Sequence, residues 1–230
     1  MQPPSIVAVT LVAGLGSRLG RPHPKCLTTL GDGETILARQ IRLLRSHGLP
    51  VIAVVGFKLE SILEAHPDLL YVYNPNYDTT NTSKSLLCAL RRIQAQDVIW
   101  LNGDVVFDDQ VLTRLLENAD STVAVNSAQV GEEEVKYATD DAGYITQISK
   151  QVAQPAGESL GINIVRRDRL EAFKSTLADV QEQDYFEKGM ELLIERDAHA
   201  FRAIDVSDLH CIEVDFEEDL RKANSLLSRE

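Results

Sequence analysis

Short apolar runs alternate with amphipathic segments over the first 130 residues of the chain. The apolar runs are rich in β-branched residues and have the length of strands; they cover residues 5–13, 51–56, 69–74, 97–104 and 121–126. The segments between them space their apolar residues along one face of a helix; they cover residues 35–48, 58–66, 81–93 and 109–119. Strands that alternate with helices over short connections predict a parallel sheet covered by helices on both faces.

The pattern changes after residue 130. Residues 133–150 predict a hairpin that turns at 140–143, and residues 159–165 form another strand-like run. The rest of the chain predicts these elements: helices at 168–180 and 184–196, a strand at 199–204 and a final helix at 216–227. We therefore predict one α/β domain over residues 1–230. A smaller α+β excursion is expected to lie over the edge of the sheet where the parallel strands end.

Composition narrows the class of protein. Hydrophobic residues make up 44% and charged residues 25% of the chain, which is ordinary for a globular domain. The net charge of -12 argues against a nucleic-acid partner and against binding to an anionic membrane. The three cysteines show no metal-ligand spacing, so we expect reduced thiols in a cytoplasmic protein. No apolar run is long enough to span a membrane, and the N-terminus does not resemble a signal peptide.

The first apolar run leads into residues 11–27, LVAGLGSRLGRPHPKCL, which hold three glycines and three cationic side chains. A dinucleotide-binding oxidoreductase is excluded, because the third glycine comes one position late and Pro22 and Pro24 would break the helix. A Walker A loop is excluded because no Ser or Thr follows Lys25. The loop should stay extended and present N–H groups and cations to a triphosphate. A flexible loop with solvated charges is the alternative.

Two aspartates stand where a phosphate-bound Mg²⁺ would find carboxylate ligands. Asp104 ends the strand-like run at 97–104, and open α/β sheets bind ligands beyond the ends of their strands. Asp215 follows a short strand-like stretch and begins the last helix. Mg²⁺ beside phosphates takes one or two carboxylates together with phosphate oxygens and water. A turn-forming role for Asp104 and a helix-capping role for Asp215 are the alternatives.

The glycine-rich loop resembles the G-x-G-x-R…P-K loop of the nucleotidyltransferase superfamily, whose members join a nucleoside triphosphate to a phosphorylated acceptor and release pyrophosphate. The segment HCIEVDFEEDL resembles the E-I-D-x-x-E-D-L segment of the same superfamily. The resemblance implies a Rossmann-like, mostly parallel mixed sheet of the nucleotide-diphospho-sugar transferase type. It implies Mg²⁺ bound by Asp104 and Asp215. The residues it implies for nucleotide binding are Val12, Ala13, Gly14, Gly16, Ser17, Arg18, Lys25, Gly103 and Asp104.

Residues 73–90, YNPNYDTTNTSKSLLCAL, resemble a segment of the small cytidylyltransferases of the phosphocholine type. This resemblance implies that Asn81 and Ser85 contact the base and ribose of CTP, with helix capping as the alternative for both. Lys150 matches a lysine that meets the acceptor phosphate in the family. The domain would then comprise a nucleotide-binding half, residues 1–130, and a half with the acceptor site and second metal ligand, residues 131–230.

Four further residues are candidates for contact with the acceptor: Tyr137, Glu158, Tyr185 and Glu187. The last three lie in segments that resemble the acceptor pocket of the family. Carboxylates and aromatic faces attract cationic groups such as choline or an amine. An aminophosphonate, a phospho-amino-acid derivative and a sugar phosphate stay open as acceptors. Ordinary amphipathic packing is the alternative for each of these residues.

We therefore predict a Mg²⁺-dependent nucleotidyltransferase that transfers CMP from CTP to a small phosphorylated alcohol or amine. Arg18, Lys25 and Lys150 are its predicted catalytic residues. A sugar-1-phosphate nucleotidyltransferase that uses UTP, dTTP or GTP is the second interpretation. A non-catalytic nucleotide-binding module is the third, although a pure binder would not require both metal carboxylates. A homodimer formed through residues 131–230 also stays open.

Overall fold

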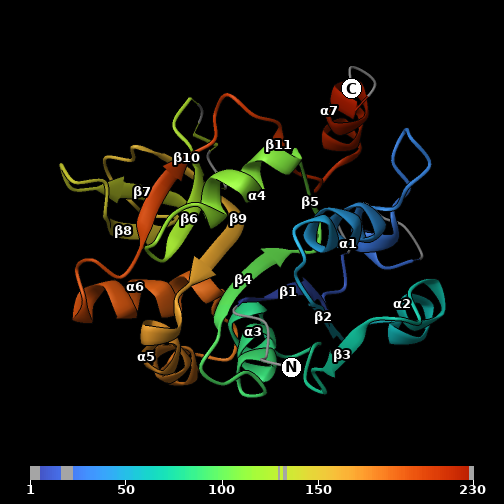
Figure 1. Cartoon of the computed structure of the whole chain (residues 1–230), viewed down its shortest axis with the longest axis horizontal. Helices are drawn as coiled ribbons and strands as arrows, with labels where there is room; N and C mark the ends of the chain where they lie inside the picture. The colour runs from blue at the N-terminus through green and yellow to red at the C-terminus, as the bar shows by residue number, and fades with distance from the viewer. Residues whose placement is uncertain (1–5, 17–22, 129, 132–133, 228–230) are drawn as a thin grey trace.

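The computed structural model describes residues 6–16, 23–128, 130–131 and 134–227. A central sheet runs through the molecule, and helices cover both of its faces (Figure 1). The strands of this sheet are β1 (Ile6–Val12), β2 (Val51–Val55), β3 (Leu70–Tyr73), β4 (Asp97–Asn102), β6 (Thr122–Asn126), β7 (Lys136–Thr139), β8 (Ile145–Ser149), β9 (Gly157–Val165) and β10 (Arg202–Asp205).

The strand order across the sheet is β10-β6-β9-β4-β1-β2-β3, and β7 joins the sheet by pairing with β9. Neighbours along this path are parallel except at β9, which runs antiparallel to both β4 and β6. The prediction of a mixed, mostly parallel sheet is therefore confirmed. The strand order reverses between β1 and β4, and open α/β sheets bind ligands beyond the strand ends at such a switch point.

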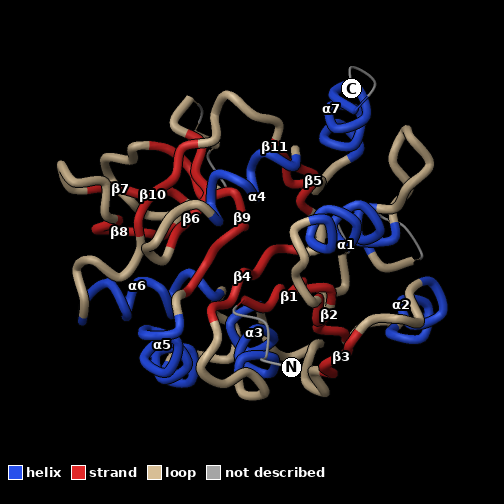
Figure 2. Tube along the Cα trace, viewed as in Figure 1, coloured by secondary structure: helices blue, strands red, loops and turns tan. Residues whose placement is uncertain are grey.

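Two hydrophobic clusters, one on each face of the sheet, form most of the core. Helices α3, α5 and α6 contribute to one cluster and α1, α2 and α4 to the other, which agrees with their positions in Figure 2. The helices are α1 (Ile36–Ser46), α2 (Leu59–Ala65), α3 (Thr82–Leu90), α4 (Asp109–Leu116), α5 (Arg167–Asp179), α6 (Phe186–Arg196) and α7 (Glu217–Leu227). In the described ranges, no helix has the length and apolar character needed to cross a membrane.

The predicted hairpin is confirmed. Strands β7 and β8 pair antiparallel, and the N–H of Gly143 donates to the carbonyl of Asp140 across the turn over 3.1 Å. Strand β7 pairs with Gly157 and Glu158 at the start of β9. Because β9 is antiparallel to its neighbours, its start lies at the edge where the parallel strands end. The hairpin is therefore placed at the predicted edge of the sheet.

A two-stranded antiparallel sheet joins a segment near the middle of the chain to a segment near its end. It pairs β5 (Val105–Phe107) with β11 (Cys211–Glu213). Strand β5 follows Asp104 directly, and β11 ends two residues before Asp215. The N–H of Val214 also donates to the backbone oxygen of Asp104 over 3.0 Å. This small sheet therefore places the two aspartates side by side.

The beginning of α6 is anchored in the core and to the beginning of α3. The Phe186 ring lies 5.7 Å from that of the fully buried Trp100, centroid to centroid. The N–H of Phe186 donates to Thr82 Oγ1 over 3.1 Å, and Ser83 Oγ donates to the carbonyl of Asp184 over 2.6 Å. These contacts hold the first turns of α3 and α6 against each other.

Lys84 joins α3 to the C-terminal end of α5, and its removal should weaken the fold. Its Nζ donates to the carbonyls of Leu177 over 3.1 Å and Val180 over 2.7 Å, at the C-terminal end of α5. We expect Lys84→Met to lower the free energy of unfolding by about 1–3 kcal/mol, because these carbonyls lose a charged donor. Urea unfolding followed by Trp100 fluorescence measures the change.

Lys188→Met is the matched control, because Lys188 forms its ion pair with Glu191 at the surface of α6. We expect that variant to change the free energy of unfolding by less than about 1 kcal/mol. Equal losses in the two variants would contradict the anchoring role of Lys84.

Candidate active site

The loop after β1 forms one wall of a cavity at the switch point between β1 and β4. The predicted nucleotide-binding residues Val12, Ala13, Gly14 and Gly16 line this first cavity. The chain returns to the cavity at Lys25, which opens the short 3-10 helix η2 (Lys25–Leu27). The predicted residues Ser17 and Arg18 lie outside the described residues. Their roles stay predictions.

The end of β4 forms the adjoining wall of the first cavity. The N–H of Gly103 donates to the carbonyl of Leu11 over 3.0 Å, so the ends of β4 and β1 are in contact. A Cβ atom on residue 103 would lie 2.5 Å from Val12 Cγ1 and 2.6 Å from the Leu11 carbonyl oxygen. Only glycine allows this approach. It places the next residue, Asp104, at the rim of the cavity.

Gln40 of α1 braces the turn that carries Asp104. Its Nε2 donates to the backbone oxygen of Asn102 over 2.9 Å and to that of Val105 over 2.8 Å, one on each side of the turn. Its Oε1 accepts from the Thr10 hydroxyl over 2.9 Å. The sequence signal for this brace is a polar residue on the apolar face of an amphipathic helix, which we did not single out.

Lys25 lies between Asp104 and Asp215 and forms ion pairs with both. Its Nζ donates to Asp104 Oδ2 over 2.7 Å and also to Asp215 Oδ1. Burial alone would lower the pKa of Lys25, but the two neighbouring carboxylates raise it above its ordinary value. The ammonium therefore stays charged, and one positive charge faces two negative ones. The structure brings together a predicted phosphate-binding lysine and both predicted metal ligands.

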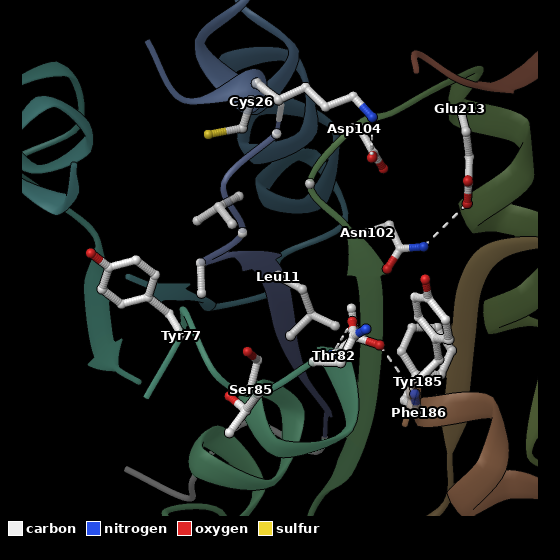
Figure 3. Close-up of a pocket in the computed structure, with 18 of the residues that line it drawn as sticks. Leu11, Cys26, Tyr77, Thr82, Ser85, Asn102, Asp104, Tyr185, Phe186 and Glu213 are labelled. Carbon is white, nitrogen blue, oxygen red and sulfur yellow. Dashed lines mark hydrogen bonds and ion pairs between the residues drawn. The ribbon is translucent and has the colours of Figure 1, made fainter. Parts of the chain in front are cut away.

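The first cavity has a volume of about 430 Å³, and the predicted base and ribose contacts line it as well. Asn81 Oδ1 accepts from the N–H of Thr82 over 2.8 Å, which is a helix-capping contact. Ser85 Oγ accepts from Asn74 Nδ2 over 3.0 Å. In Figure 3, Ser85 and Thr82 lie at one end of the cavity and Asp104 lies at the other. The cavity thus connects the predicted base site with the charged cluster.

A second cavity, of about 890 Å³, adjoins the first. The residues that line both cavities, here called the shared wall, are Asn102, Tyr185, Glu187, Glu213 and Asp215. The predicted acceptor residues Lys150 and Glu158 line the second cavity with Tyr185 and Glu187 of the shared wall. Six carboxylates and two lysines line this second cavity, so its described surface is acidic.

Tyr137 does not join the other acceptor candidates. Within the described part of the chain it lines neither cavity, and its side chain is only 4% exposed. It belongs to the same hydrophobic cluster as Val125 and Ile148. Side chains alternate between the two faces along a strand, and Tyr137 falls on the core face of β7. We therefore correct the expectation that Tyr137 contacts the acceptor.

Two glutamates belong to the shared wall, and of these Glu187 is buried and Glu213 is half-buried. Burial raises the pKa of Glu187, in the first turn of α6, to about 7. Burial and the negative charge of Asp104 raise the pKa of Glu213 well above its ordinary value. Glu213 accepts a hydrogen bond from Asn102 Nδ2 over 3.1 Å. We gave Glu213 no role from the sequence, although it stands two positions before Asp215, a spacing that shares one face of a strand.

The charged cluster has the donors that a nucleotide-bound Mg²⁺ needs. Among the described residues, no group of three or more His, Cys, Asp and Glu side chains is arranged to hold a metal on its own. Asp104 and Asp215 supply two carboxylates, and phosphate oxygens complete such sites. Asp104 Oδ1 is buried and has no hydrogen-bond partner among the described residues. A cation coordinated by Asp104 Oδ1 would give this oxygen a partner. The residues present therefore fit a Mg²⁺ ion.

The mixed sheet and the charged cavity at its β1/β4 switch point define a nucleotidyltransferase-type α/β domain. Residues 8–197 match the MobA-like NTP transferase domain, and the chain belongs to this family. Its fold is similar to that of the CTP:phosphocholine cytidylyltransferase from Streptococcus pneumoniae, with a TM-score of 0.77 and 18% identity over 97% of this chain and 100% of that one. The inositol-1-phosphate CTP transferase from T. maritima gives a TM-score of 0.80 and 16% identity over 98% and 95%.

Curated relatives are similar in sequence over most of this chain. The CMP-5'-(3-aminopropyl)phosphonate synthase of Streptomyces rubellomurinus is 32% identical over 94% of this chain and 38% of its own length. The bifunctional protein GlmU of Methanococcus maripaludis is 26% identical over 90% of this chain and 49% of its own length. The chain thus spans less than half the length of each of these two relatives.

The buried carboxyl of Glu187 should make stability depend on pH. Because folding raises its pKa from 4.5 to about 7, the folded state binds this proton more tightly than the unfolded state. The carboxyl therefore destabilises the fold increasingly as the pH rises from about 4.5 to about 7. We expect Glu187→Gln to gain stability relative to the unsubstituted protein between pH 5 and pH 8, measured by urea unfolding without ligands.

Glu191→Gln, one turn further along α6, is the control for this measurement, because Glu191 pairs with Lys188 at the surface. Its stability difference from the unsubstituted protein should stay nearly constant over the same pH range. A difference for Glu187→Gln that does not change with pH would contradict the burial of an ionising group at that position.

Proposed function

We propose that the chain transfers CMP from CTP to a phosphate or phosphonate oxygen of a small acceptor, with release of pyrophosphate. The observation that carries this proposal is the meeting of Lys25, Asp104 and Asp215 where the two cavities adjoin. Asp215 lines both cavities, so the charged cluster faces both substrates. The first cavity would hold the nucleotide and the second the acceptor.

The reaction needs positioned charges rather than a strong base. An acceptor oxygen attacks the α-phosphorus of CTP and forms a P–O bond. The bond from that phosphorus to the oxygen bridging to the β-phosphate breaks, and pyrophosphate leaves with that oxygen. Phosphate and phosphonate oxygens are ionised at neutral pH, so positioning and charge neutralisation supply most of the catalysis. Lys25 would neutralise the triphosphate together with Arg18, and Lys150 would orient the acceptor's anionic group.

Asp104 and Asp215 are the residues that would hold Mg²⁺, which when bound neutralises phosphate charge and orients the phosphates for displacement. In the present structure, Lys25 takes the position between these carboxylates. When a triphosphate enters, its oxygens offer Lys25 another set of anionic partners. We infer that Lys25 then exchanges the aspartates for the nucleotide, which leaves both carboxylates to the metal.

The choice of CTP and of a cationic acceptor draws support from two sources. One is the sequence likeness to a CMP-aminopropylphosphonate synthase over 94% of the chain. The other is the acidic second cavity, which suits an acceptor with a positive charge. Transfer to a sugar-1-phosphate with UTP, dTTP or GTP is favoured by the GlmU relative. A neutral sugar would bring no positive charge to Glu187 and Glu213, so we place this second.

The proposal is tested by pyrophosphate release across a panel of substrates. CTP, UTP, dTTP, GTP and ATP are each combined with Mg²⁺ and with phosphocholine, 2-aminoethylphosphonate or glucose-1-phosphate. We expect release with CTP and an acceptor that carries a cationic group. Asp104→Ala and Asp215→Ala should each lower kcat by about 100-fold or more while circular dichroism shows an intact fold.

Asp179→Ala is the control, because Asp179 is an exposed partner of Arg196 at the C-terminal end of α5 and lines neither cavity. It should retain near-normal kcat. Release with UTP and glucose-1-phosphate alone would support the sugar-nucleotide alternative. Near-normal activity of Asp215→Ala would show that the two-carboxylate site is wrong.

Removal of Lys25 should expose the metal ligands before nucleotide binds. We expect Lys25→Met to bind Mn²⁺ at least about tenfold more tightly than the unsubstituted protein in the absence of nucleotide, since a positive charge no longer lies between the carboxylates. Its affinity for CTP should fall. Electron paramagnetic resonance of free Mn²⁺ measures the first change and calorimetry the second.

Lys222→Met is the control, because it removes a more exposed lysine from the second cavity. It should leave the Mn²⁺ affinity nearly unchanged. Equal effects of the two substitutions on Mn²⁺ affinity would contradict this account.

A further inference from the structure

The shared wall presents buried oxygen atoms that lack a hydrogen-bond donor. Within the described residues, Asn102 Oδ1 and Glu187 Oε2 are buried and have no hydrogen-bond partner. Asn102 Nδ2 donates to Glu213, so the other end of this amide is the acceptor oxygen. Buried polar atoms in native proteins are almost always hydrogen-bonded. The wall is therefore suited to a ligand that donates hydrogen bonds.

That ligand should also carry a positive charge. Glu187 and Glu213 place two carboxylates in the shared wall, the first buried and the second half-buried. Lys25 already pairs with the two aspartates. Lys150 acts on Glu187 through its charge, but its Nζ lies over the Tyr185 ring, 5.6 Å from the centroid. Buried carboxylates are stable chiefly when a cation pairs with them, so a bound cation would improve the balance of charge.

The number of aromatic side chains in the second cavity indicates whether it suits a quaternary ammonium group or an ammonium group with N–H donors. Quaternary ammonium groups donate no hydrogen bonds and are recognised by cages of aromatic rings. The aromatic residues that line the second cavity within the described ranges are Tyr185 and Phe216. Lys150 already lies over the ring of Tyr185, and Phe216 is 54% exposed. Tyr137 is buried in the core, so among the described residues Tyr185 and Phe216 are the tyrosine and phenylalanine rings that this cavity offers to a cation.

Gly161 of β9 keeps the paired side chains of this wall in place. Its φ is +67°, in the region that favours glycine. A Cβ atom there would lie 2.6 Å from Glu213 Oε1 and 2.7 Å from Asn102 Nδ2. A side chain at residue 161 would therefore displace the hydrogen-bonded pair. The backbone of β9 thus makes the room that Glu213 occupies.

We propose that the acceptor is a primary amine, and that its ammonium group binds at Glu187, Glu213 and Asn102 Oδ1. This inference rests on the proposed function and names the part of the acceptor that the shared wall selects. A primary ammonium has three N–H donors, which match oxygen acceptors of this kind. The phosphate or phosphonate of the same molecule lies toward Lys150, which lines the same second cavity. A trimethylated amine has the charge but none of the donors.

The test compares three acceptors with CTP and Mg²⁺: 2-aminoethylphosphonate, its N,N,N-trimethyl analogue and ethylphosphonate, which has no amine. We expect kcat/KM for the primary amine to exceed that for the trimethyl analogue by about tenfold or more. Glu187→Gln and Glu213→Gln should each lower kcat/KM for the primary amine by about tenfold or more, chiefly through KM. Each loss should be at least about threefold smaller for ethylphosphonate, because that acceptor has no amine to pair with the carboxylates. Glu191→Gln, on the surface of α6, is the control and should leave the preference intact.

Calorimetry with CTP but without Mg²⁺ measures acceptor binding independently of turnover. Tighter binding of the primary amine than of the trimethyl analogue, lost in Glu187→Gln, supports the ammonium site even if no CMP transfer occurs; the proposed function alone would then fail. Equal kcat/KM for the two amines, with turnover present, overturns the ammonium site and leaves the transferase standing. If both variants lose kcat/KM equally with 2-aminoethylphosphonate and ethylphosphonate, the ammonium site is also overturned, because the carboxylates would then not bind the amine.

Discussion

The ion pairs of Lys25 with Asp104 and Asp215 join three segments that are far apart along the chain. Lys25 follows the loop after β1, Asp104 follows β4, and Asp215 follows β11 near the end of the chain. Backbone contacts hold these segments in register, among them the hydrogen bond from Val214 to the carbonyl of Asp104. Both cavities are arranged around this cluster. Its position therefore decides where a nucleotide and an acceptor can meet.

Several carboxylates lie close together at the site, and packing elsewhere in the structure must offset their unfavourable effect on stability. Glu187 is buried and Glu213 lies half-buried near Asp104, and carboxylates withdrawn from water destabilise a fold when they lack a cationic partner. The aromatic core next to the site offsets this effect. Phe186 packs edge-on against Trp100 immediately before Glu187, and aromatic pairs of this kind contribute about 0.5–1.5 kcal/mol each. This packing holds the first turn of α6 in place. The carboxyl group of Glu187 therefore stays at the shared wall, where a ligand can contact it.

Local patterns predict most of the elements and part of the site, whereas pairings between distant segments do not follow from them. The apolar run of β1, the helices and the hairpin carry clear periodicity. The antiparallel insertion of β9 between β4 and β6 has no local signal, and β5 is too short for one. Lys25, Asp104 and Asp215 stand out by residue type and by family resemblance. The role of Glu213 depends on its contact with Asn102, and the burial of Tyr137 depends on which face of β7 meets the core.

The most direct test of this account is a crystal structure of the protein with CTP and Mg²⁺. We predict that the triphosphate lies in the first cavity, that Asp104 and Asp215 hold the metal, and that Lys25 contacts phosphate oxygens in place of the aspartates. A nucleotide bound outside this cavity, or a Lys25 that keeps both aspartates while the triphosphate is bound, would contradict the central claim.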